Sequence, residues 1–289
     1  MTKPNSKLEE KYRILQNIFD EMGSALVAFS GGIDSTVVLK AAYTVLGDQA
    51  VAVTAVSPTF PARELTVVRQ VVAEIGAPLR LVQTDQLQID EFVRNDASRC
   101  FHCKTDLYQL LSGIQQELGF HGIVDGTNAD DLQDDRPGIQ AARSLGVRSP
   151  LVEAGLGKEE IRSLAQALGL SNWNKPAAAC LSSRVPRGIP ITRATLSRVE
   201  EAEALLVAEG LEQVRVRDHT GIARIEVEGP ELLLFLDGQR RRRIVNALKE
   251  LGFRFVTVDL EGYRSGSTNI QHEDSTPNGS SDRKEKGSN

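Results

Sequence analysis

The sequence predicts an α/β protein in which a doubly wound parallel sheet is followed by a smaller α+β domain. Up to residue 168, short apolar runs alternate with stretches of helical length and spacing. From residue 192 this alternation gives way to a helix, a hairpin, a helix and a strand. Ligands of doubly wound sheets bind beyond the carboxyl ends of the strands, so we expect the site in the loops that follow strands.

The first part begins with a helix over 7–22, where six apolar residues follow helical spacing. Ala25–Phe29 is an unbroken apolar run, typical of a parallel strand buried on both faces. The apolar residues that follow this run again have the length and spacing of a helix. The same reasoning gives expected strands over 50–56, 79–84 and 122–126, and expected helices over 36–46, 61–75, 108–118 and 158–168.

In the second part, Thr192 is the expected cap of a helix that runs to about residue 209. Alternating strands over 213–218 and 223–228 flank Thr220-Gly221 and predict a hairpin. A helix over 237–251 and a strand over 254–260 complete the part. The helix contains the run Arg240–Arg243, which favours a solvated face or a subunit contact over a nucleic-acid patch.

The expected domains are residues 7–178 and 179–264, and the polar segments 1–6 and 265–289 are expected to be disordered. A net charge of −5 gives no reason to expect nucleic-acid binding. No apolar run approaches the ~18 residues of a membrane helix, and the N-terminus lacks an apolar signal core. We therefore expect a cytoplasmic protein without a membrane partner. Its three cysteines are too few for a disulfide scaffold and favour a metal or redox set.

The string SGGIDS, residues 30–35, joins the first strand to the next helix. Two glycines allow the backbone to approach an anion, and hydroxyl groups and the helix N-terminus add donors and positive charge. No Gly-Lys-Ser/Thr follows, so this is not a Walker loop. The alternative is an ordinary glycine-rich turn. The string resembles the SGGxDS PP-loop of the ATP pyrophosphatase superfamily. That resemblance implies a fold of the PP-loop type and ATP cleaved to AMP and pyrophosphate, bound by Ser30, Gly31, Gly32, Asp34 and Ser35.

Two further loops follow expected strands. The prolines of residues 57–61 suit one wall of an adenosine pocket, although a plain strand-to-helix turn explains them equally well. Residues 125–131, DGTNADD, resemble the GTNxxD segment of PP-loop enzymes. The resemblance implies that Thr127, Asn128 and Asp131 contact the adenylate and its Mg²⁺, an ion that prefers carboxylate and phosphate oxygens. An acidic surface loop is the alternative.

Cys100 and Cys103 form a C-x2-C pair that we expect in a loop leading into a helix, and Cys180 is distant in sequence. A structural zinc site normally has four ligands, and no second pair is present. Three cysteines without a fourth suit a [4Fe–4S] cluster with one open iron. A zinc ion with another fourth ligand, or small buried hydrophobes plus a free thiol, are the alternatives.

Residues 175–188, KPAAACLSSRVPRG, resemble the KPxxxCLxSRxPxG signature of the LarE family, the synthases of pyridinium-3,5-bisthiocarboxylic acid mononucleotide. The likeness extends over residues ~7 to ~263 and includes SGGIDS, the C-x2-C pair and DGTNADD. It implies that ATP adenylylates each carboxylate of a pyridinium biscarboxylate mononucleotide and that sulfur then displaces AMP. The product is the precursor of the nickel-pincer nucleotide that lactate racemase uses. A homo-oligomer, such as a hexamer, is also implied.

Members of this family have two sulfur sources. Some sacrifice the cysteine that matches Cys180, and others hold a [4Fe–4S] cluster on three cysteines. This chain resembles the cluster type through Cys100, Cys103 and Cys180, and a sacrificial Cys180 stays open.

Five other charged residues have expected roles. Lys104 and Arg184 are candidates to stabilise negative charge near the α-phosphate. On the expected strand 213–218, Arg215 and Arg217 share one face, which the residues alone predict to be solvated. The resemblance instead implies that this pair holds the substrate phosphate. It also implies a functional acid in the preceding helix, for which Glu203 is the best match and Glu200 the alternative.

Three other functions compete with this interpretation. A tRNA-thiolating PP-loop enzyme would need a broad basic surface or an RNA-binding domain, and neither is visible in the sequence. A PP-loop amidating synthetase explains none of the cysteines. A non-catalytic module that binds a nucleotide or a cluster is compatible with the sequence.

Overall fold

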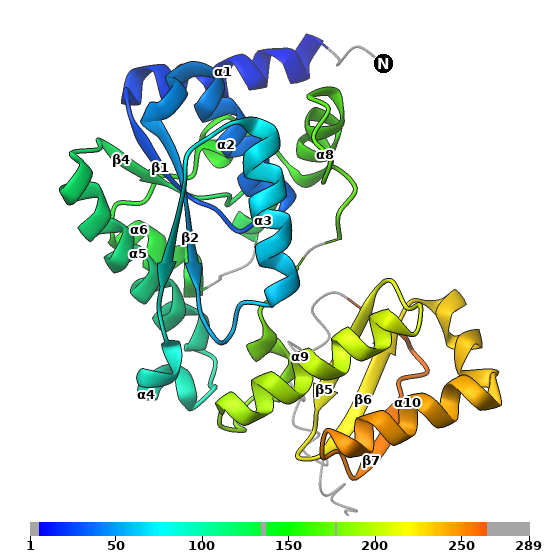
Figure 1. Cartoon of the computed structure of the whole chain (residues 1–289). Coiled ribbons are helices and arrows are strands. Elements are labelled where there is room, and N and C mark those ends of the chain that lie inside the picture. The colour runs from blue at the N-terminus through cyan, green and yellow to red at the C-terminus, as the bar shows by residue number, and fades with distance from the viewer. Residues whose placement is uncertain (1–5, 134–136, 177, 265–289) are drawn as a thin grey trace, which may run out of the picture.

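The computed structural model describes residues 6–133, 137–176 and 178–264, and its ribbon has a larger and a smaller part (Figure 1). Helix α1 (Ser6–Met22) opens the larger part, so Ser6 is ordered and the prediction of disorder is wrong for that residue. The remaining residues of the predicted disordered segments, 1–5 and 265–289, lie outside the described residues.

A four-stranded parallel sheet forms the centre of the larger part. Its strands are β1 (Ala25–Ala28), β2 (Ala50–Val56), β3 (Leu79–Gln83) and β4 (Gly122–Val124), in the order β3-β2-β1-β4. An isolated parallel bridge from Val124 to Arg148 extends the sheet beyond β4. The chain moves outward from β1 to β3 and then returns to the other side of β1. The strand order therefore reverses between β1 and β4, and the predicted fold class is confirmed.

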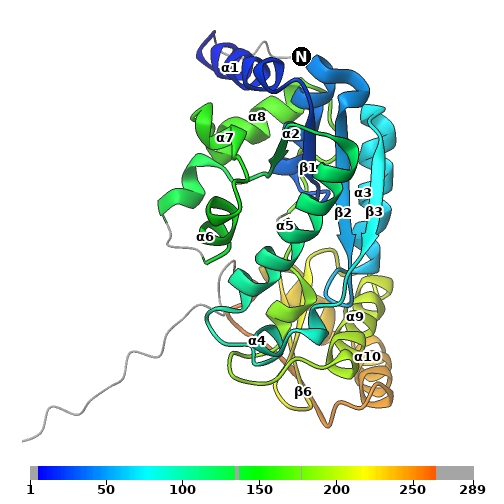
Figure 2. The ribbon, with the colours of Figure 1, turned by 90° about the vertical axis from the view of Figure 1, so that its left-hand side faces the viewer.

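Helices cover both faces of this sheet (Figure 2). One core contains α1, α2 (Ile33–Leu46), α3 (Ala62–Ile75) and α8 (Lys158–Ala167), and the other contains α5 (Arg99–Leu118) and α6 (Pro137–Ser144). Side chains alternate between faces along each strand, so Ala25 and Val27 enter the first core and Leu26 the second. The short helices α4 (Asp90–Val93) and α7 (Pro150–Glu153), like α6, were not predicted.

Two helices begin earlier than predicted. Helix α2 starts at Ile33 instead of residue 36, which places Asp34 and Ser35 in its first turn. Helix α5 starts at Arg99 instead of residue 108 and contains Cys100 and Cys103, so the prediction that this pair lies in a loop is wrong. Before it, the Asp96 carboxylate accepts hydrogen bonds from the backbone and hydroxyl of Ser98. This turn, with no glycine or proline between it and residue 108, allows the helix to start early.

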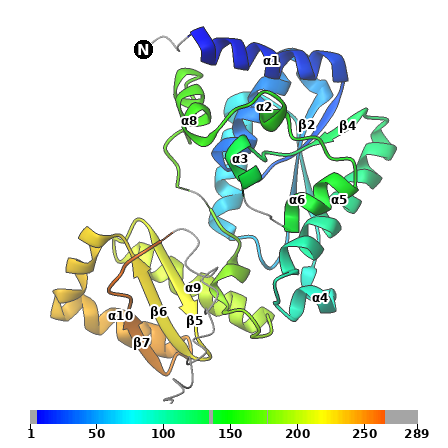
Figure 3. The same cartoon turned by 180° about the vertical axis from the view of Figure 1, so that it is seen from behind.

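The smaller part has a three-stranded sheet in the order β5-β6-β7. Strand β5 (Val214–Asp218) is antiparallel to β6 (Ile222–Val227), and β7 (Phe255–Val258) is parallel to β6. Helices α9 (Arg193–Ala208) and α10 (Gly238–Glu250) cover one face, and Figure 3 shows the sheet in front of them. The Thr192 side chain caps α9, as predicted. An unpredicted 3₁₀ segment, η5 (Gly229–Leu236), precedes α10.

A separate apolar cluster joins the two parts. Phe92 of α4 packs there with residues that follow the predicted boundary at 178, and Cys103 packs against its edge. The residues from the second part are Leu181, Val185, Ile191, Leu196 and Val199. Both predicted domains thus share this cluster, and the boundary itself stays a prediction. Over the described ranges, no helix is long and apolar enough to cross a membrane.

We predict that Gly126→Ala destabilises the protein, because an alanine Cβ would lie 2.8 Å from the Ser35 backbone nitrogen. Overpacking of this kind costs about 1–3 kcal/mol, which thermal unfolding would report as a lower Tm. Gly113→Ala in α5 is the matched control, because its Cβ would meet no atom within 4 Å. That variant should gain about 0.5–1 kcal/mol from helix propensity. Equal effects of the two substitutions would contradict the close approach at Gly126.

Candidate active site

The PP-loop lies between β1 and the first turn of α2, at the carboxyl edge of the sheet. Gly31 has φ +73°, a backbone conformation that favours glycine, and a Cβ there would touch Val68 at 3.0 Å. The Ser30 and Ser35 hydroxyl oxygens are 3.2 Å apart, and the Ser35 hydroxyl donates to the Gly32 carbonyl at 3.0 Å. The loop therefore has a defined shape, with a helix N-terminus and two hydroxyl groups at its centre.

The loop after β4 packs directly against the PP-loop, because β1 and β4 are neighbours. Gly126 has no side chain to separate it from the Ser35 backbone, and the Asn128 amide donates to Asp34 at 3.5 Å. Asn128 is fully buried, and its side-chain oxygen accepts the backbone N–H groups of Asp130 and Asp131. The structure thus brings the two predicted nucleotide-binding segments together.

Two carboxylates face each other across this contact. Burial, followed by the nearby charge of Asp131, raises the pKa of Asp34 to about 6. Lys158 at the start of α8 forms an ion pair with Asp131 at 3.2 Å. A divalent cation would relieve the repulsion between these carboxylates, and oxygen ligands of this kind suit Mg²⁺.

Asp125, at the end of β4, connects this loop with Lys104. Its carboxylate accepts hydrogen bonds from the Tyr108 hydroxyl at 2.9 Å, the Thr127 hydroxyl at 2.9 Å and the Ser149 hydroxyl at 2.8 Å. The Lys104 ammonium lies 5.5 Å from the centre of the Tyr108 ring. Tyr108 and then Asp125 raise the pKa of Lys104, so this residue supplies a positive charge beside the predicted adenylate loop.

The three cysteines come from two segments that are distant in sequence, and Cys180 is near enough to Cys103 to affect its pKa. Cys100 and Cys103 are half-buried in the first turn and a half of α5, and Cys180 is exposed. Burial, followed by the proximity of Cys180, raises the pKa of Cys103 to about 12, and Cys100 acts in the same direction. This environment favours the neutral thiol over the thiolate, and a metal that bound here would have to replace the proton.

The cysteines remain candidate ligands of either a cluster or a single ion. Among the described residues, no three Cys, His, Asp or Glu side chains are grouped closely enough for one metal ion. A four-iron cluster is larger than one ion and separates its ligands more widely. Cys180 and Cys100 both raise the pKa of Cys103 while Lys104 lowers it, and thiolates are the usual ligands of such a group.

Backbone contacts hold Cys180 at the carboxyl edge of the large sheet. The N–H of Leu181 donates to the Thr59 carbonyl at 2.9 Å, which ties Cys180 to the loop after β2. The carbonyl of Cys180 accepts from the Arg184 guanidinium at 2.9 Å and the Ser183 hydroxyl at 2.8 Å. The exposed thiol therefore sits on a rigid support in η4 (Leu181–Arg184) and its flank.

Arg184 and Glu203 form a buried pair below this support. Arg184 is 0% exposed and Glu203 is 2% exposed, and two nitrogens of the guanidinium contact the carboxylate at 2.8 and 3.1 Å. Glu203 also accepts from Arg63 at 3.1 Å and from the Val216 N–H at 3.1 Å. The alternative acid, Glu200, instead accepts the backbone N–H of Ala62 at 2.6 Å.

Arg215 and Arg217 are each only 6% exposed, so the prediction of a solvated face is wrong. They project from the sheet face opposite α9 and α10, towards the Cys180 segment. Arg217 binds both carboxylate oxygens of Glu226 at 2.7 and 2.8 Å and donates to the Ser183 carbonyl at 2.8 Å. The Arg215 guanidinium stacks 5.3 Å from the centre of the Tyr263 ring. Arg217 contacts the Cys180 segment and Arg215 contacts Tyr263, on a face that strand alternation alone leaves open.

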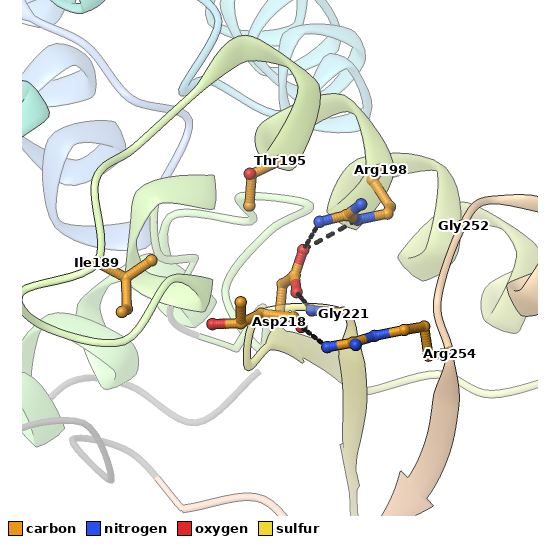
Figure 4. A pocket seen from close by; sticks show the side chains of 8 residues that line it. Ile189, Thr195, Arg198, Asp218, Gly221, Gly252 and Arg254 are labelled. Atoms are coloured by element: carbon orange, nitrogen blue, oxygen red, sulfur yellow. Dashed lines mark hydrogen bonds and ion pairs between the residues drawn. The ribbon is translucent and has the colours of Figure 1, made fainter.

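Surface pockets occur elsewhere in the described part of the chain. One, of about 510 Å³, is lined by Ser57, Pro58 and Arg193 among others and lies at the ends of β2 and β3, where an adenosine wall was predicted. Another, of about 370 Å³, lies in the smaller part, and Figure 4 shows Arg198 paired with Asp218 in it. It contains none of the predicted site residues.

Sequence reasoning missed several residues that build this site. Asp125 is the first residue of the DGTNADD segment, but the sequence did not predict that its carboxylate binds three hydroxyl groups from different segments. The Asn172 amide donates to the Gly31 carbonyl at 3.2 Å and the Thr36 hydroxyl at 2.9 Å, a contact between segments with no shared sequence signal. Arg63, Asn95 and Arg99 also depend on distant partners.

Comparisons with known proteins agree with this geometry. Residues 21–207 match the family model described as thiamine biosynthesis protein (ThiI). An uncharacterized protein of Synechocystis sp. is 45% identical over 91% of this chain and 98% of its own length. Pyridinium-3,5-bisthiocarboxylic acid mononucleotide synthase of Lactiplantibacillus plantarum is 40% identical over 91% of this chain and 95% of its own length.

A more distant relative covers only part of the chain. An uncharacterized protein of Methanocaldococcus jannaschii is 32% identical over 62% of this chain and 69% of its own length. The synthase from L. plantarum, by contrast, matches across both parts of the molecule. The family resemblance read from the sequence is thereby confirmed. The chain belongs to the LarE family of pyridinium-3,5-bisthiocarboxylic acid mononucleotide synthases.

Proposed function

We propose that this protein is an ATP-dependent sulfur transferase that converts the carboxylates of pyridinium-3,5-biscarboxylic acid mononucleotide to thiocarboxylates, in the synthesis of a nickel-pincer nucleotide. The observation that carries the proposal is the position of Cys180. The segment that holds it is bonded to the loop after β2, and its thiol lies within electrostatic reach of Cys103. These contacts support a sulfur site at the same edge of the sheet as the proposed nucleotide site.

The nucleotide half of the reaction belongs to the PP-loop and the loop after β4. We assign pyrophosphate binding to Ser30, Gly31, Gly32 and Ser35, and Mg²⁺ to Asp34 and Asp131. Thr127 and Asn128 complete the contacts to the nucleotide. A substrate carboxylate attacks the α-phosphorus and releases pyrophosphate, which forms an acyl adenylate. The Lys104 ammonium stabilises the negative charge that develops on the α-phosphate.

The substrate half belongs to the smaller part and the Cys180 segment. We assign the substrate phosphate to Arg215 and Arg217, because guanidinium groups match phosphate oxygens. The contacts of Arg184 favour a positioning role, since its guanidinium binds Glu203 and the Cys180 carbonyl. Glu203 in turn orients Arg63 and Arg184.

Adenylylation removes the charge that makes a carboxylate a poor acceptor for a nucleophile. Sulfur then attacks the acyl carbon, the C–O bond to AMP breaks, and AMP leaves with the bonding electrons. A [4Fe–4S] cluster on Cys100, Cys103 and Cys180 would supply an open iron that binds the sulfur to be transferred. A sacrificial Cys180 is the second candidate, and the exposure of its thiol favours it specifically.

An assay of pyrophosphate release with defined acceptors tests this function. Release should depend on the pyridinium biscarboxylate mononucleotide and should be absent with tRNA. Release with tRNA would support the tRNA-thiolating alternative, and ammonia-dependent amide formation would support an amidating synthetase. ATP binding without any acceptor-dependent release would support a non-catalytic module.

The family resemblance also leads us to propose a homo-oligomer. The smaller part exposes large apolar side chains that an assembly would cover, namely Leu233, Leu236, Phe255 and Leu260. Light scattering of the full chain measures the oligomeric state, and a monomer at all concentrations would contradict this proposal.

We predict that Mg·ATP affinity falls as the pH drops below about 6, because protonation of Asp34 removes a ligand charge. Asp34→Asn should bind Mg·ATP weakly at every pH. The titration of ATP itself affects both proteins equally, so the ratio of the wild-type affinity to the variant affinity reports the titration of Asp34 alone. The variant should also make the nucleotide-free protein more stable at neutral pH, because burial of the ionised Asp34 carboxylate lowers the free energy of unfolding there. Titration calorimetry between pH 5 and 8, roughly the range around this pKa, makes the measurement.

We predict about four irons and four sulfides per chain in protein prepared without oxygen, and loss of both in Cys100→Ser and Cys103→Ser. These variants should be unable to complete more than one turnover. If reconstituted wild-type protein binds no iron, the cluster is wrong. In that case the chain should become lighter by one molecule of hydrogen sulfide after one turnover, as peptide mass spectrometry at Cys180 would show.

A further inference from the structure

The start of α5 and the Cys180 segment are joined by buried hydrogen bonds that the proposed reaction does not use. Asn95 lies just before α5, is fully buried and has φ +57°, a left-handed conformation that asparagine tolerates. Its amide nitrogen donates to the carbonyls of Pro186 at 2.8 Å, Ile189 at 2.9 Å and Val185 at 3.4 Å. One side chain thus gathers the chain that follows Cys180.

Arg99 completes the connection from the other side. It is 6% exposed, and its Nη1 donates to the Asn95 side-chain oxygen at 2.5 Å and to the Ser182 carbonyl at 2.9 Å. Arg99 is bonded covalently to Cys100, and Ser182 is two residues after Cys180. The C-x2-C pair and the segment that holds Cys180 are therefore connected through one atom, the Nη1 nitrogen of Arg99.

These bonds are buried, which makes their geometry strict. A donor or acceptor that loses its partner inside the protein carries the full cost of desolvation, so the three carbonyls and Asn95 favour one arrangement. Backbone bonds from Gly188 to Asn95 at 3.1 Å and from Ile191 to Val93 at 3.0 Å continue the same contact. The described partners of Arg99 are both neutral, so its charge is available to balance negative charge beside it.

We propose that Asn95 and Arg99 form a clamp that sets the spacing between Cys180 and the C-x2-C pair, and that they are positioning residues for the sulfur site. This inference rests on the proposed sulfur transfer for its purpose, but its geometry concerns only the thiols. None of the described side-chain hydrogen bonds of Asn95 or Arg99 reaches the PP-loop, so the clamp should act on sulfur chemistry and leave nucleotide binding intact.

Thiol cross-linking in the metal-free full chain tests the clamp. Diamide takes two hydrogen atoms from a pair of thiols and leaves a disulfide, and peptide mass spectrometry measures the rate at which Cys180 joins Cys100 or Cys103. Arg99→Met and Asn95→Gly should slow this rate about tenfold, as expected when buried bonds to a charged group are lost. Asn95→Gly retains access to the left-handed backbone, so it removes only the side-chain bonds.

Two further variants separate positioning from general damage. Arg99→Lys should recover much of the rate, because one ammonium can donate to both oxygens as Nη1 does. Arg94→Met, at an exposed arginine nearby that pairs with Glu91, should match wild type. ATP binding by calorimetry should be unchanged in every variant, which reports an intact larger part. Cross-linking of Arg99→Met at the wild-type rate, or no recovery in Arg99→Lys, would overturn the clamp.

Iron and sulfide content after reconstitution without oxygen gives a second readout. Both should fall in Arg99→Met and recover in Arg99→Lys. If wild-type protein cross-links readily and the clamp variants do not, while none of them binds iron, the cluster mechanism fails and the clamp stands. If iron content is high and equal in all variants, the clamp is wrong and the cluster mechanism stands.

Discussion

The buried ion pair between Arg184 and Glu203 is the constraint on which the arrangement of the site depends. Four elements meet at Glu203, because Arg63 comes from α3, Arg184 from η4 and the Val216 N–H from β5, while Glu203 itself is in α9. Removal of one partner from such a pair typically costs about 3–5 kcal/mol, since it leaves a charge buried without compensation. The pair therefore disfavours alternative packings of the two parts more than it adds net stability.

This constraint has a direct consequence for Cys180. The Nε and Nη2 of Arg184 bind Glu203, and its Nη1 donates to the carbonyls of Ala179 at 2.7 Å and Cys180 at 2.9 Å. The thiol is thus exposed while hydrogen bonds hold the backbone that carries it, a combination that suits the proposed sulfur transfer. A loop free to move would expose the thiol equally well but would not hold it near the acyl carbon.

Local patterns in the sequence predicted the fold class, the PP-loop and the loop after β4. Each depends on a short strand, a turn and a helix start, and adjacency of β1 and β4 follows from the topology of doubly wound sheets. The sequence did not reveal that Arg215 and Arg217 are buried, because the segment that covers them lies outside the strand. Asn95 was equally invisible, since its partners at Val185, Pro186 and Ile189 are distant in sequence. The early start of α5 was missed because two cysteines with metal-ligand spacing suggested a loop.

The two halves of the site treat charge in opposite ways. In the proposed nucleotide half, burial and Asp131 raise the pKa of Asp34, so this half holds an electrostatic penalty that Mg²⁺ would relieve. In the proposed substrate half, Arg217 is matched by Glu226 and Arg184 by Glu203, so the cations are already oriented and desolvated. Nucleotide binding should therefore depend strongly on metal and pH, whereas the substrate half is organised before substrate arrives. This order suits a reaction in which an activated acyl group must meet sulfur before it meets water.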